Sequence, residues 1–527
     1  MCGIAGIIDF KAAVSRSTIE AMCCAIHHRG PDHSGLLVQQ GAQFSLGLGS
    51  QRLSIIDLSD AGNMPICNEA GDVWIVYNGE LYNHRELRAE LEARGHQYSS
   101  NTDTETIVHA YEEYGLNCLK RFNGMFAFAL YDQRNERVVL ARDPMGIKPL
   151  HYAWDGNRLT FCSELRGLFA AEQCRPPLDP VAVNLYLSLG YIPSPHSIYS
   201  GVRKLPPGAS LVIENRTCTL DMFWTPQLRP SSDGPRDLDS LTETTRTVIE
   251  DAVVRQLMSD VPVGVFLSGG LDSSIVTVLA QRHHGDVMDT FSVGFGRDGG
   301  GLDTRDLYNQ DLVHARAVAA AMGTRHHEVV VPTDDRIAGL IMDTLAHMDE
   351  PVWESSFVSL HVMSRLARDH GVKVVLTGDG GDELFGGYPW YFGAQRFERL
   401  QRLPFLQHAL PFLQAIGGSS ILAVKARDLR LRLRQDDIGR YRINHDIFSE
   451  IEKHDLIGTN AIERQADDPV SQYVRELFDA SGAETWTERL AMADLTLWVR
   501  DHFNQRVDRM SMMNSIEARV PLQDQQV

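Results

Sequence analysis

The second residue of the chain is a cysteine, and its position could make it a nucleophile. If the initiator methionine is removed, Cys2 carries a thiol and a free α-amino group on one residue. An α-amino group titrates near about 7.7 to 8.0 and a thiol near about 8.5, so the amine can act as base for its own side chain. The sequence therefore predicts an amino-terminal nucleophile that needs no separate histidine.

Other side chains in the first half could build a pocket for a free α-amino acid. Arg52 could bind an α-carboxylate through both arms of its guanidinium. The Asn78 side-chain amide and the Gly79 N–H, which follow an apolar run, could form an oxyanion hole. Glu80 and Asp103 offer carboxylates to an α-ammonium group. Singly, Asn78-Gly79 is a turn dipeptide and Asp103 a helix cap, but together they favour a pocket that faces a nucleophile.

The second half contains a glycine-rich loop of the kind that binds phosphate. Residues 268–274, Ser-Gly-Gly-Leu-Asp-Ser-Ser, follow the apolar run 263–267 and precede a helical pattern. This order of strand, loop and helix points a helix N-terminus at an anion. No Gly-Lys-Ser/Thr follows the glycines. The negative charge of Asp272 is tolerated beside phosphates mainly when a divalent cation lies between them. The loop predicts cleavage at an α-phosphate with release of pyrophosphate; the alternative is an ordinary strand-to-helix turn capped by serine.

A second acidic, glycine-rich loop follows a later apolar run. Residues 377–388 come directly after 372–376, and Asp382 could face Asp272. Two carboxylates together with phosphate oxygens suit Mg²⁺. His326 and His327 are not predicted to chelate a metal, because adjacent residues of a strand point to opposite faces.

The hydrophobic pattern places these residues on two kinds of sheet. The half up to about residue 215 is strand-rich with flanking helices, and 124–131 and 137–143 alternate like a hairpin. The second half alternates strands with helices, which implies a mostly parallel sheet that binds ligands beyond the carboxyl ends of its strands. Residues 225–237, rich in proline, are the predicted linker. We expect strands at 263–267, 290–295, 326–331 and 372–376, and helices at 239–258, 271–284, 309–322 and near residues 335 and 357.

Length and composition are those of a soluble globular protein of two or three domains. The chain has 527 residues, 43% of them hydrophobic and 23% charged, with a formal net charge of −19, which argues against nucleic acid as a partner. No apolar run approaches 18 residues and no basic leader is present, so we expect a cytoplasmic protein without membrane contact. The eight cysteines form no CxxC pair, which makes disulfides and cysteine zinc sites poor interpretations.

Taken together, the motifs resemble those of the glutamine-hydrolysing asparagine synthetases over essentially the whole chain. They are Cys2, residues 28–32, 52–56 and 78–80, Asp103, and residues 268–274. The resemblance implies a mixed α/β and α+β protein. A class II glutamine amidotransferase domain at 2–218, an αββα sandwich of the N-terminal-nucleophile type, would precede a linker at 219–238. Residues 239–527 would form an ATP-pyrophosphatase-type domain, a parallel α/β fold similar to the adenine-nucleotide α-hydrolases.

The resemblance also assigns residues to roles. Asp379 matches an acidic position linked to forming an acyl-adenylate, and Asp272 and Asp382 would bind Mg²⁺. Catalysis in the first domain would use Cys2, Asn78 and Gly79. Glutamine would be bound by Arg52, Leu53, Ser54, Ile55, Ile56, Asn78, Gly79, Glu80 and Asp103, and ATP by Leu267, Ser268, Gly269, Gly270, Asp272, Ser273, Ser274, Val293, Thr377 and Gly378.

The implied reaction amidates aspartate to asparagine. Glutamine would donate the nitrogen through a thioester at Cys2, and ATP with Mg²⁺ would activate aspartate as β-aspartyl-AMP, releasing AMP, pyrophosphate and glutamate. Family members often carry a lysine where this chain offers Arg506 or Arg509. The resemblance also allows a homodimer.

Two other functions stay open. Because no strong motif marks the aspartate pocket, the acceptor could be another carboxylate, on a surface polysaccharide precursor or a peptide. The sequence also stops at Val527, where family members continue through further helices, so we expect a second domain that is incomplete at its C-terminus. Such a chain could be a glutaminase or a regulatory partner that makes no asparagine.

Overall fold

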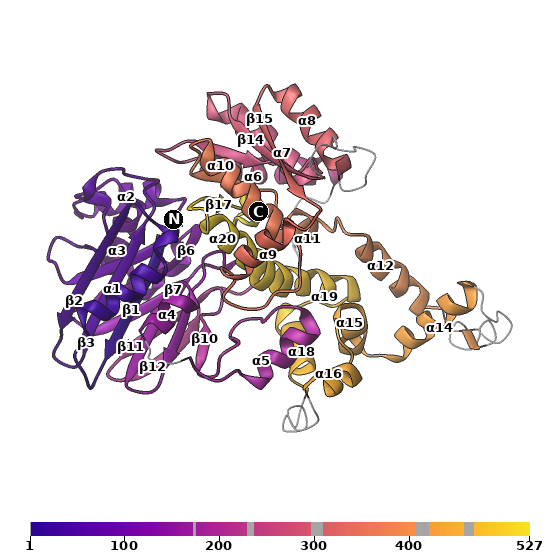
Figure 1. Ribbon diagram of the computed structural model, residues 1–527, viewed down its shortest axis with the longest axis horizontal. Coiled ribbons are helices and arrows are strands. Elements are labelled where there is room, and N and C mark those ends of the chain that lie inside the picture. Colours follow the sequence, from indigo (N-terminus) through magenta and orange to yellow (C-terminus); the bar gives the residue numbers. More distant parts are fainter. Residues whose placement is uncertain are drawn as a thin grey trace.

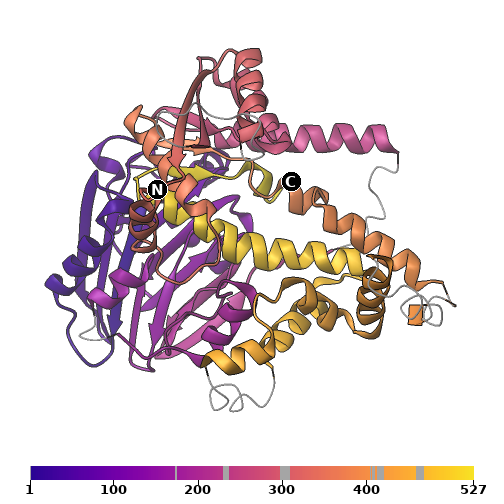
Figure 2. The ribbon, with the colours of Figure 1, turned by 45° about the vertical axis from the view of Figure 1, so that its right-hand side comes forward.

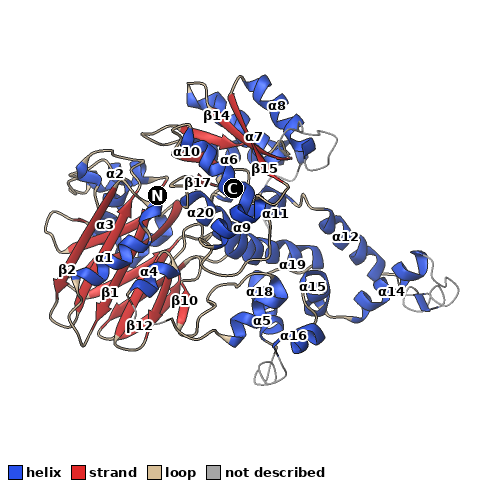
Figure 3. Ribbon diagram, in the orientation of Figure 1, coloured by secondary structure: helices blue, strands red, loops and turns tan. Residues whose placement is uncertain are grey.

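A computed structural model describes residues 2–171, 175–228, 237–296, 309–403, 405, 410–411, 421–457 and 468–527. They form a two-sheet sandwich, a parallel sheet flanked by helices, and a group of helices that extends away from both (Figures 1 and 3).

The first unit contains two six-stranded sheets with antiparallel pairing. One has the strand order β10-β8-β9-β1-β3-β2 and the other β12-β11-β7-β6-β5-β4. The predicted hairpin is confirmed, because β6 and β7 pair in antiparallel register. The strands are β1 (Cys2–Asp9), β2 (His33–Gln40), β3 (Ser45–Arg52), β4 (Ile66–Cys67), β5 (Val73–Leu81), β6 (Gly124–Asp132), β7 (Arg137–Arg142), β8 (His151–Trp154), β9 (Arg158–Cys162), β10 (Val202–Lys204), β11 (Ala209–Glu214) and β12 (Thr217–Met222).

Helices cover the outer face of each sheet. Between the sheets, Ile4 and Leu48 of one pack with Val76 and Leu140 of the other. The outer faces bury the apolar sides of α1 (Arg16–Ala25) and α4 (Leu165–Ala170), and of α2 (His84–Ala93) and α3 (Asp103–Tyr114). The layers run helix, sheet, sheet, helix, which confirms the predicted αββα sandwich.

The sandwich continues past residue 218, where the resemblance places the start of the linker, and its last strand ends before residue 225, where the proline-rich stretch begins. Strand β12 stays paired with β11 as far as Met222, opposite Ala209. Part of the predicted linker, residues 229–236, lies outside the described residues.

The second unit is a five-stranded sheet in which every strand pair is parallel. Its order is β15-β14-β13-β16-β17. Four strands lie where the hydrophobic runs predicted them, whereas β17 was not predicted. The strands are β13 (Val263–Phe266), β14 (Asp289–Gly296), β15 (Arg325–Pro332), β16 (Val374–Leu376) and β17 (Glu517–Arg519).

Helices pack on both faces of the parallel sheet, as the alternating pattern predicted. On one face, Val253 of α6 and Leu279 of α7 pack against Val265. On the other face, Met363 of α10 and Val507 of α20 pack with Phe266. The helices of this unit are α6 (Leu238–Gln256), α7 (Leu271–His284), α8 (Gln310–Met322), α9 (Ile337–Leu345), α10 (Ser356–Asp369), α11 (Gly381–Phe385) and α20 (Asn504–Met512).

Most of the remaining helices share a core with α5, which follows the first unit in sequence. Leu185 and Leu189 of α5 pack with Val474 and Leu490. Among the described residues, no helix combines the length and apolarity needed to cross a bilayer. The helices are α5 (Pro180–Leu189), α12 (Pro389–Gln401), α14 (Ile421–Arg434), α15 (Asp437–His445), α16 (Glu450–Ile457), α18 (Pro469–Ser481), α19 (Trp486–Ala493) and the π-helix η5 (Asp494–Phe503).

Helix α20 and strand β17 lie between the sandwich and the rest of the second unit (Figure 2). Met512 and Val520 of this segment pack against Tyr82, Met125 and Ile147 of the sandwich. The two halves therefore meet through a buried apolar contact, which fixes their sites relative to each other.

Candidate active sites

Cys2 begins strand β1, where it lies opposite Arg52 of β3. Its side chain is buried. Burial raises the pKa of the Cys2 thiol, while the N–H of Leu53 and the charge of Arg52 lower it. The thiol is therefore neutral in this setting and requires a base before it can attack.

Asn78, near the end of β5, is oriented by Cys2. The Asn78 Oδ1 accepts a hydrogen bond from the Cys2 backbone nitrogen at 3.0 Å. Its Nδ2 is fully buried and has no hydrogen-bond partner among the described residues. A buried amide donor without a partner costs free energy, and such a group is well suited to an incoming oxyanion. At Gly79, a Cβ would lie 2.2 Å from the Met125 carbonyl oxygen, so no side chain fits there.

A small pocket brings Cys2 together with most of the residues predicted to bind glutamine. Seven of them line it, whereas Asn78 and Ser54 do not: Asn78 binds the Cys2 nitrogen, and the Ser54 N–H donates to Asp32. The free space is about 20 Å³, enough for about one water, so glutamine enters only when part of the lining moves. The lining comprises Cys2, Arg52, Leu53, Ile55, Ile56, Gly62, Met64, Tyr77, Gly79, Glu80, Thr102, Asp103 and Thr104.

Arg52 has a structural function that the sequence did not indicate. Its Nη1 donates to the Ser59 carbonyl at 3.1 Å and to Asn63 Oδ1 at 2.8 Å. Its Nη2 donates to the carbonyls of Ile56 and Asp57. The guanidinium thus holds the loop 56–63 beside the pocket, and binding a carboxylate there requires it to exchange some of these partners. The predicted contact with glutamine stays a prediction.

The two candidate carboxylates for the ammonium group differ in environment. Burial raises the pKa of Glu80 well above its usual range, and the charges of Glu517 and Asp103 raise it further, against the opposing charge of Arg519. Glu80 Oε1 lies 3.6 Å from Arg519 Nη2. Asp103 Oδ2 accepts from the Tyr77 hydroxyl at 3.1 Å and from the Leu81 N–H at 2.7 Å. Tyr77 was missed, although it directly precedes Asn78.

In the second unit, the loop after β13 is organised by its own serines. The Ser268 N–H donates to the Ser273 Oγ at 3.2 Å, and the Gly270 N–H donates to the Ser268 Oγ at 3.3 Å. Gly269 has φ +90°, and a Cβ there would lie 2.1 Å from the Asp311 carbonyl oxygen. The loop leads into α7, as predicted. Of the other predicted ATP-binding residues, Leu267 is buried beneath the loop and Val293 is half-buried on β14.

The second acidic loop packs directly against the first. A Cβ on Gly378 would lie 2.5 Å from the Ser273 backbone nitrogen, and one on Gly381 would lie 2.4 Å from an Asp272 carboxylate oxygen. The glycines therefore allow the two loops to meet. Thr377 directly follows β16, and its N–H donates to the carbonyl of Arg519 at 2.9 Å.

Three carboxylates gather where the two loops meet. Burial and then the charges of Asp382 and Asp379 raise the pKa of Asp272 to about 6. A divalent cation would relieve this repulsion, and carboxylate oxygens are the ligands that Mg²⁺ prefers. The donor set at Asp272 and Asp382 therefore fits the predicted ion.

Arg506 and Arg509, the two candidates for the role of the lysine, have different surroundings in the structure. Arg506 Nη2 lies 3.4 Å from Asp379 Oδ1, and its Nη1 pairs with Glu354 at 2.5 Å. Arg509 is instead fully buried between Glu164, at 2.9 Å, and Asp349, at 2.7 Å. Only Arg506 borders the acidic loops.

A further residue, Arg29, was quoted in the sequence as part of a motif but given no role. Its Nε donates to the Cys2 carbonyl at 3.1 Å, and its Nη1 pairs with Glu164 at 2.9 Å and with Asp508 at 2.8 Å. All four residues are buried. The sequence offered one signal for this role, the position of Arg29 within the motif 28–32. The pairing with Asp508 could not be predicted, because the two residues are far apart in the sequence.

Two protein-family models match the two halves of the chain. The model for the glutamine amidotransferase domain matches residues 1–224, and the asparagine synthase model matches residues 244–527. Glutamine phosphoribosylpyrophosphate amidotransferase from Bacillus subtilis, a solved structure, has a TM-score of 0.32 at 13% identity over 72% of this chain and 81% of that one.

The curated relatives align along nearly the whole chain. Putative asparagine synthetase (glutamine-hydrolysing) 2 of Methanocaldococcus jannaschii is 34% identical, over 97% of this chain and 98% of the relative. Asparagine synthetase (glutamine-hydrolysing) 1 of Bacillus subtilis is 31% identical, over 100% of this chain and 80% of the relative. With both family models and these full-length similarities in place, the chain belongs to the family of glutamine-hydrolysing asparagine synthetases.

Proposed function

We propose that this enzyme makes asparagine from aspartate, with glutamine as nitrogen donor and ATP as the source of activation. The observation that carries the proposal is the connection of the two candidate sites through helix α20. Asp508 of this helix pairs with Arg29, which donates to the Cys2 carbonyl, while Arg506 of the same helix contacts Asp379 in the second site. A helix that contacts both sites is expected where two half-reactions must be coordinated.

In the first half-reaction, the Cys2 thiol attacks the side-chain amide carbon of glutamine. After removal of the initiator methionine, the α-amino group of Cys2 takes the thiol proton. The oxyanion is stabilised by Asn78 Nδ2, which is buried and without a partner among the described residues, and by the Gly79 N–H. The carbon–nitrogen bond breaks, ammonia leaves with the proton returned by the amine, and water hydrolyses the thioester to glutamate.

In the second half-reaction, the aspartate β-carboxylate attacks the α-phosphorus of ATP. Pyrophosphate leaves, and its charge is compensated by Arg506 in the position where other family members often carry lysine. Ammonia then attacks the carbonyl carbon of the β-aspartyl-AMP, and AMP leaves. Asp272 and Asp382 would hold Mg²⁺, which when bound supplies positive charge to the phosphates. Cytoplasmic location, a homodimer and the individual site roles stay predictions from the sequence.

The test is product analysis by mass spectrometry. The enzyme is supplied with ATP, glutamine labelled with ¹⁵N in its amide, and ¹³C-aspartate. We expect ¹⁵N,¹³C-asparagine together with AMP and pyrophosphate in equal amounts. Pyrophosphate release that does not depend on aspartate would instead favour another acceptor. Glutamate formation without asparagine, even with excess ammonia, would show a chain that only hydrolyses glutamine.

A further inference from the structure

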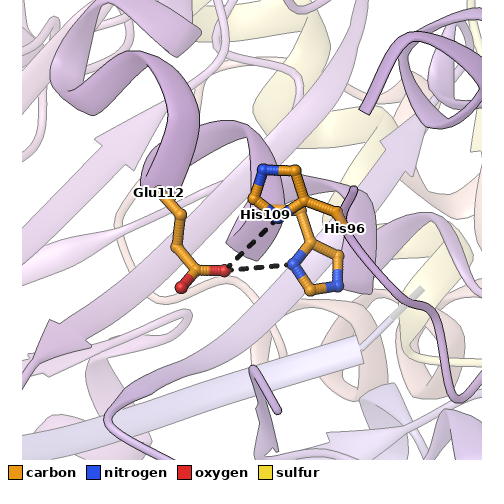
Figure 4. Close-up of side chains that lie close together, drawn as sticks. All are labelled: His96, His109 and Glu112. Carbon is orange, nitrogen blue, oxygen red and sulfur yellow. Dashed lines mark hydrogen bonds and ion pairs between the residues drawn. The ribbon is translucent and has the colours of Figure 1, made fainter. Parts of the chain in front are cut away.

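A cluster of two histidines and a glutamate lies on helix α3 and the segment before it (Figure 4). His109 and Glu112 are three residues apart on α3, so they share one face of the helix. His96 comes from the segment between α2 and α3. The His109 Nδ1 lies 3.1 Å from Glu112 Oε2, and the His96 Nδ1 lies 3.9 Å from the same oxygen. The cluster takes no part in the pocket around Cys2.

Neighbouring residues orient Glu112 toward the two imidazoles. Its other oxygen, Oε1, accepts from Asn68 Nδ2 at 2.7 Å and pairs with Arg134 Nη2 at 3.3 Å. This arrangement leaves Oε2 facing His96 and His109. Metal-binding carboxylates are commonly fixed through their second oxygen in this way.

His109 is buried among carboxylates, and one of its ring nitrogens makes no hydrogen bond within the described part of the chain. Its side chain is fully buried, and its Nε2 makes no hydrogen bond among the described residues, although Glu105 Oε1 lies 3.8 Å away. Carboxylate oxygens of Glu112, Glu105 and Glu69 lie 3.1, 3.8 and 3.9 Å from its ring nitrogens. The carboxylates around His109 thus create a site that attracts positive charge.

We propose that His96, His109 and Glu112 bind a divalent transition-metal ion of the zinc class. Two imidazole nitrogens and a carboxylate oxygen form a typical ligand set for zinc, and the three ligand atoms lie within 4.8 Å of one another. Bonds of about 2.0–2.2 Å in a tetrahedral site place ligand atoms roughly 3.4 Å apart, which lies between the two measured separations.

Further contacts complete the proposed site. The carboxylate of Glu105 faces Nε2 of His109, the nitrogen that the metal does not use, as in carboxylate–histidine–zinc arrangements. Glu105 itself is fixed by Ser99 and Ser100. A fourth ligand comes from water or from Glu69 Oε2, which lies 3.9 Å from His109 Nδ1. The bound ion would join the segment before α3 to the helix that begins with Asp103.

The experiment measures metal binding by the full-length protein. The protein is treated with a chelator, placed in excess Mg²⁺ to occupy the acidic loops of the second site, and titrated with Co²⁺. We expect one Co²⁺ per chain, with visible d–d absorption and without the near-ultraviolet band of cobalt–thiolate bonds. Zn²⁺ should displace the Co²⁺ and raise the melting temperature, with an increase that follows the logarithm of the Zn²⁺ concentration. Absence of binding, or a thiolate band, overturns the proposal.

Variants test whether these residues are the ligands. His96→Ala and Glu112→Gln should each weaken Zn²⁺ binding at least about tenfold, with an unchanged circular dichroism spectrum. His283→Ala is the matched control, because His283 pairs with Glu250 at 2.6 Å on the surface and no third metal ligand joins them within the described part of the chain. Its Zn²⁺ affinity should equal that of the unmodified protein. Unchanged affinity in both His96→Ala and Glu112→Gln overturns the proposal.

Discussion

The guanidinium of Arg29 lies 2.8 Å from the carboxylate of Asp508, and both side chains are buried. The ion pair joins the motif that supports Cys2 to the helix that carries Arg506. Arg29 also donates a hydrogen bond to the Cys2 carbonyl, so a shift of α20 that moves Arg29 would change this hydrogen bond. Arg29 and Asp508 connect the Cys2 carbonyl to helix α20.

Replacing Arg29 with methionine should destabilise the protein by about 3–5 kcal/mol, because Asp508 and Glu164 would be left as buried charges with one partner fewer. Thermal or urea unfolding measures the change. Arg246→Met is the control, since Arg246 pairs with Glu243 on the surface, where an ion pair contributes about 0–1 kcal/mol. Equal stability of the two variants would contradict a structural role for the buried pair.

Cys2→Ala should reduce glutamine-dependent asparagine synthesis by about 10⁴-fold or more, because the nucleophile is lost. Synthesis from added ammonia should be retained, since the acidic loops do not contain Cys2. Both rates are measured with the same ATP and aspartate concentrations. Equal loss of the two activities would argue against separate sites.

Asn78→Ala should lower kcat for glutamine hydrolysis by about 10²–10³-fold, the usual effect of removing one oxyanion donor. Asn78→Asp separates the two functions of this side chain, because aspartate keeps an acceptor for the Cys2 nitrogen but lacks the Nδ2 donor. We expect a comparable loss in the aspartate variant. Near-normal hydrolysis by Asn78→Asp would show that holding Cys2 is the more important function.

The KM for glutamine should fall as pH rises above the ordinary range of a glutamate. The folded protein holds the pKa of Glu80 well above its usual value, mainly by burial and then by Glu517 and Asp103. Below that raised pKa the carboxyl group is neutral and does not balance the glutamine ammonium, whereas above it the group is charged. In Glu80→Gln, KM should be high and independent of this ionisation. The same pH slope in both proteins would exclude Glu80 as its source.

Arg506→Ala should slow pyrophosphate release and asparagine synthesis by about 10²–10³-fold, because positive charge beside Asp379 is lost. Arg506→Lys should retain part of the rate, since it keeps the charge but not the forked geometry. Glutamine hydrolysis measured without ATP serves as the control and should change little. If alanine and lysine variants synthesise asparagine equally well, charge at this position is not used.

The sequence predicted those elements that local signals specify. The strand predicted at 263–267 is β13 (Val263–Phe266), and α7 ends where Gly285 adopts φ +85°. Buried strands and glycine caps leave such signals in a few neighbouring residues. The same signals placed the two glycine-rich loops at the carboxyl ends of strands of one sheet, and the structure shows that these strands, β13 and β16, are adjacent.

Other features depend on contacts between distant segments and leave no local signal. Strand β17 contains only Glu517, Ala518 and Arg519, yet all three are buried against β16. An acidic and a basic residue in three positions do not resemble a buried strand. Likewise, Arg506 and Arg509 are one turn apart on α20. The packing of the two halves determines that Arg506 contacts Asp379 and Arg509 contacts Glu164.

The position of β17 in the chain has a consequence for the order of events on the ribosome. The sandwich is translated first and can fold as a unit while later residues are still being added. Glu80 acquires the countercharge of Arg519 only after β17 has been translated and has paired beside β16. A nascent chain thus completes the surroundings of Glu80 only after β17 has joined the parallel sheet.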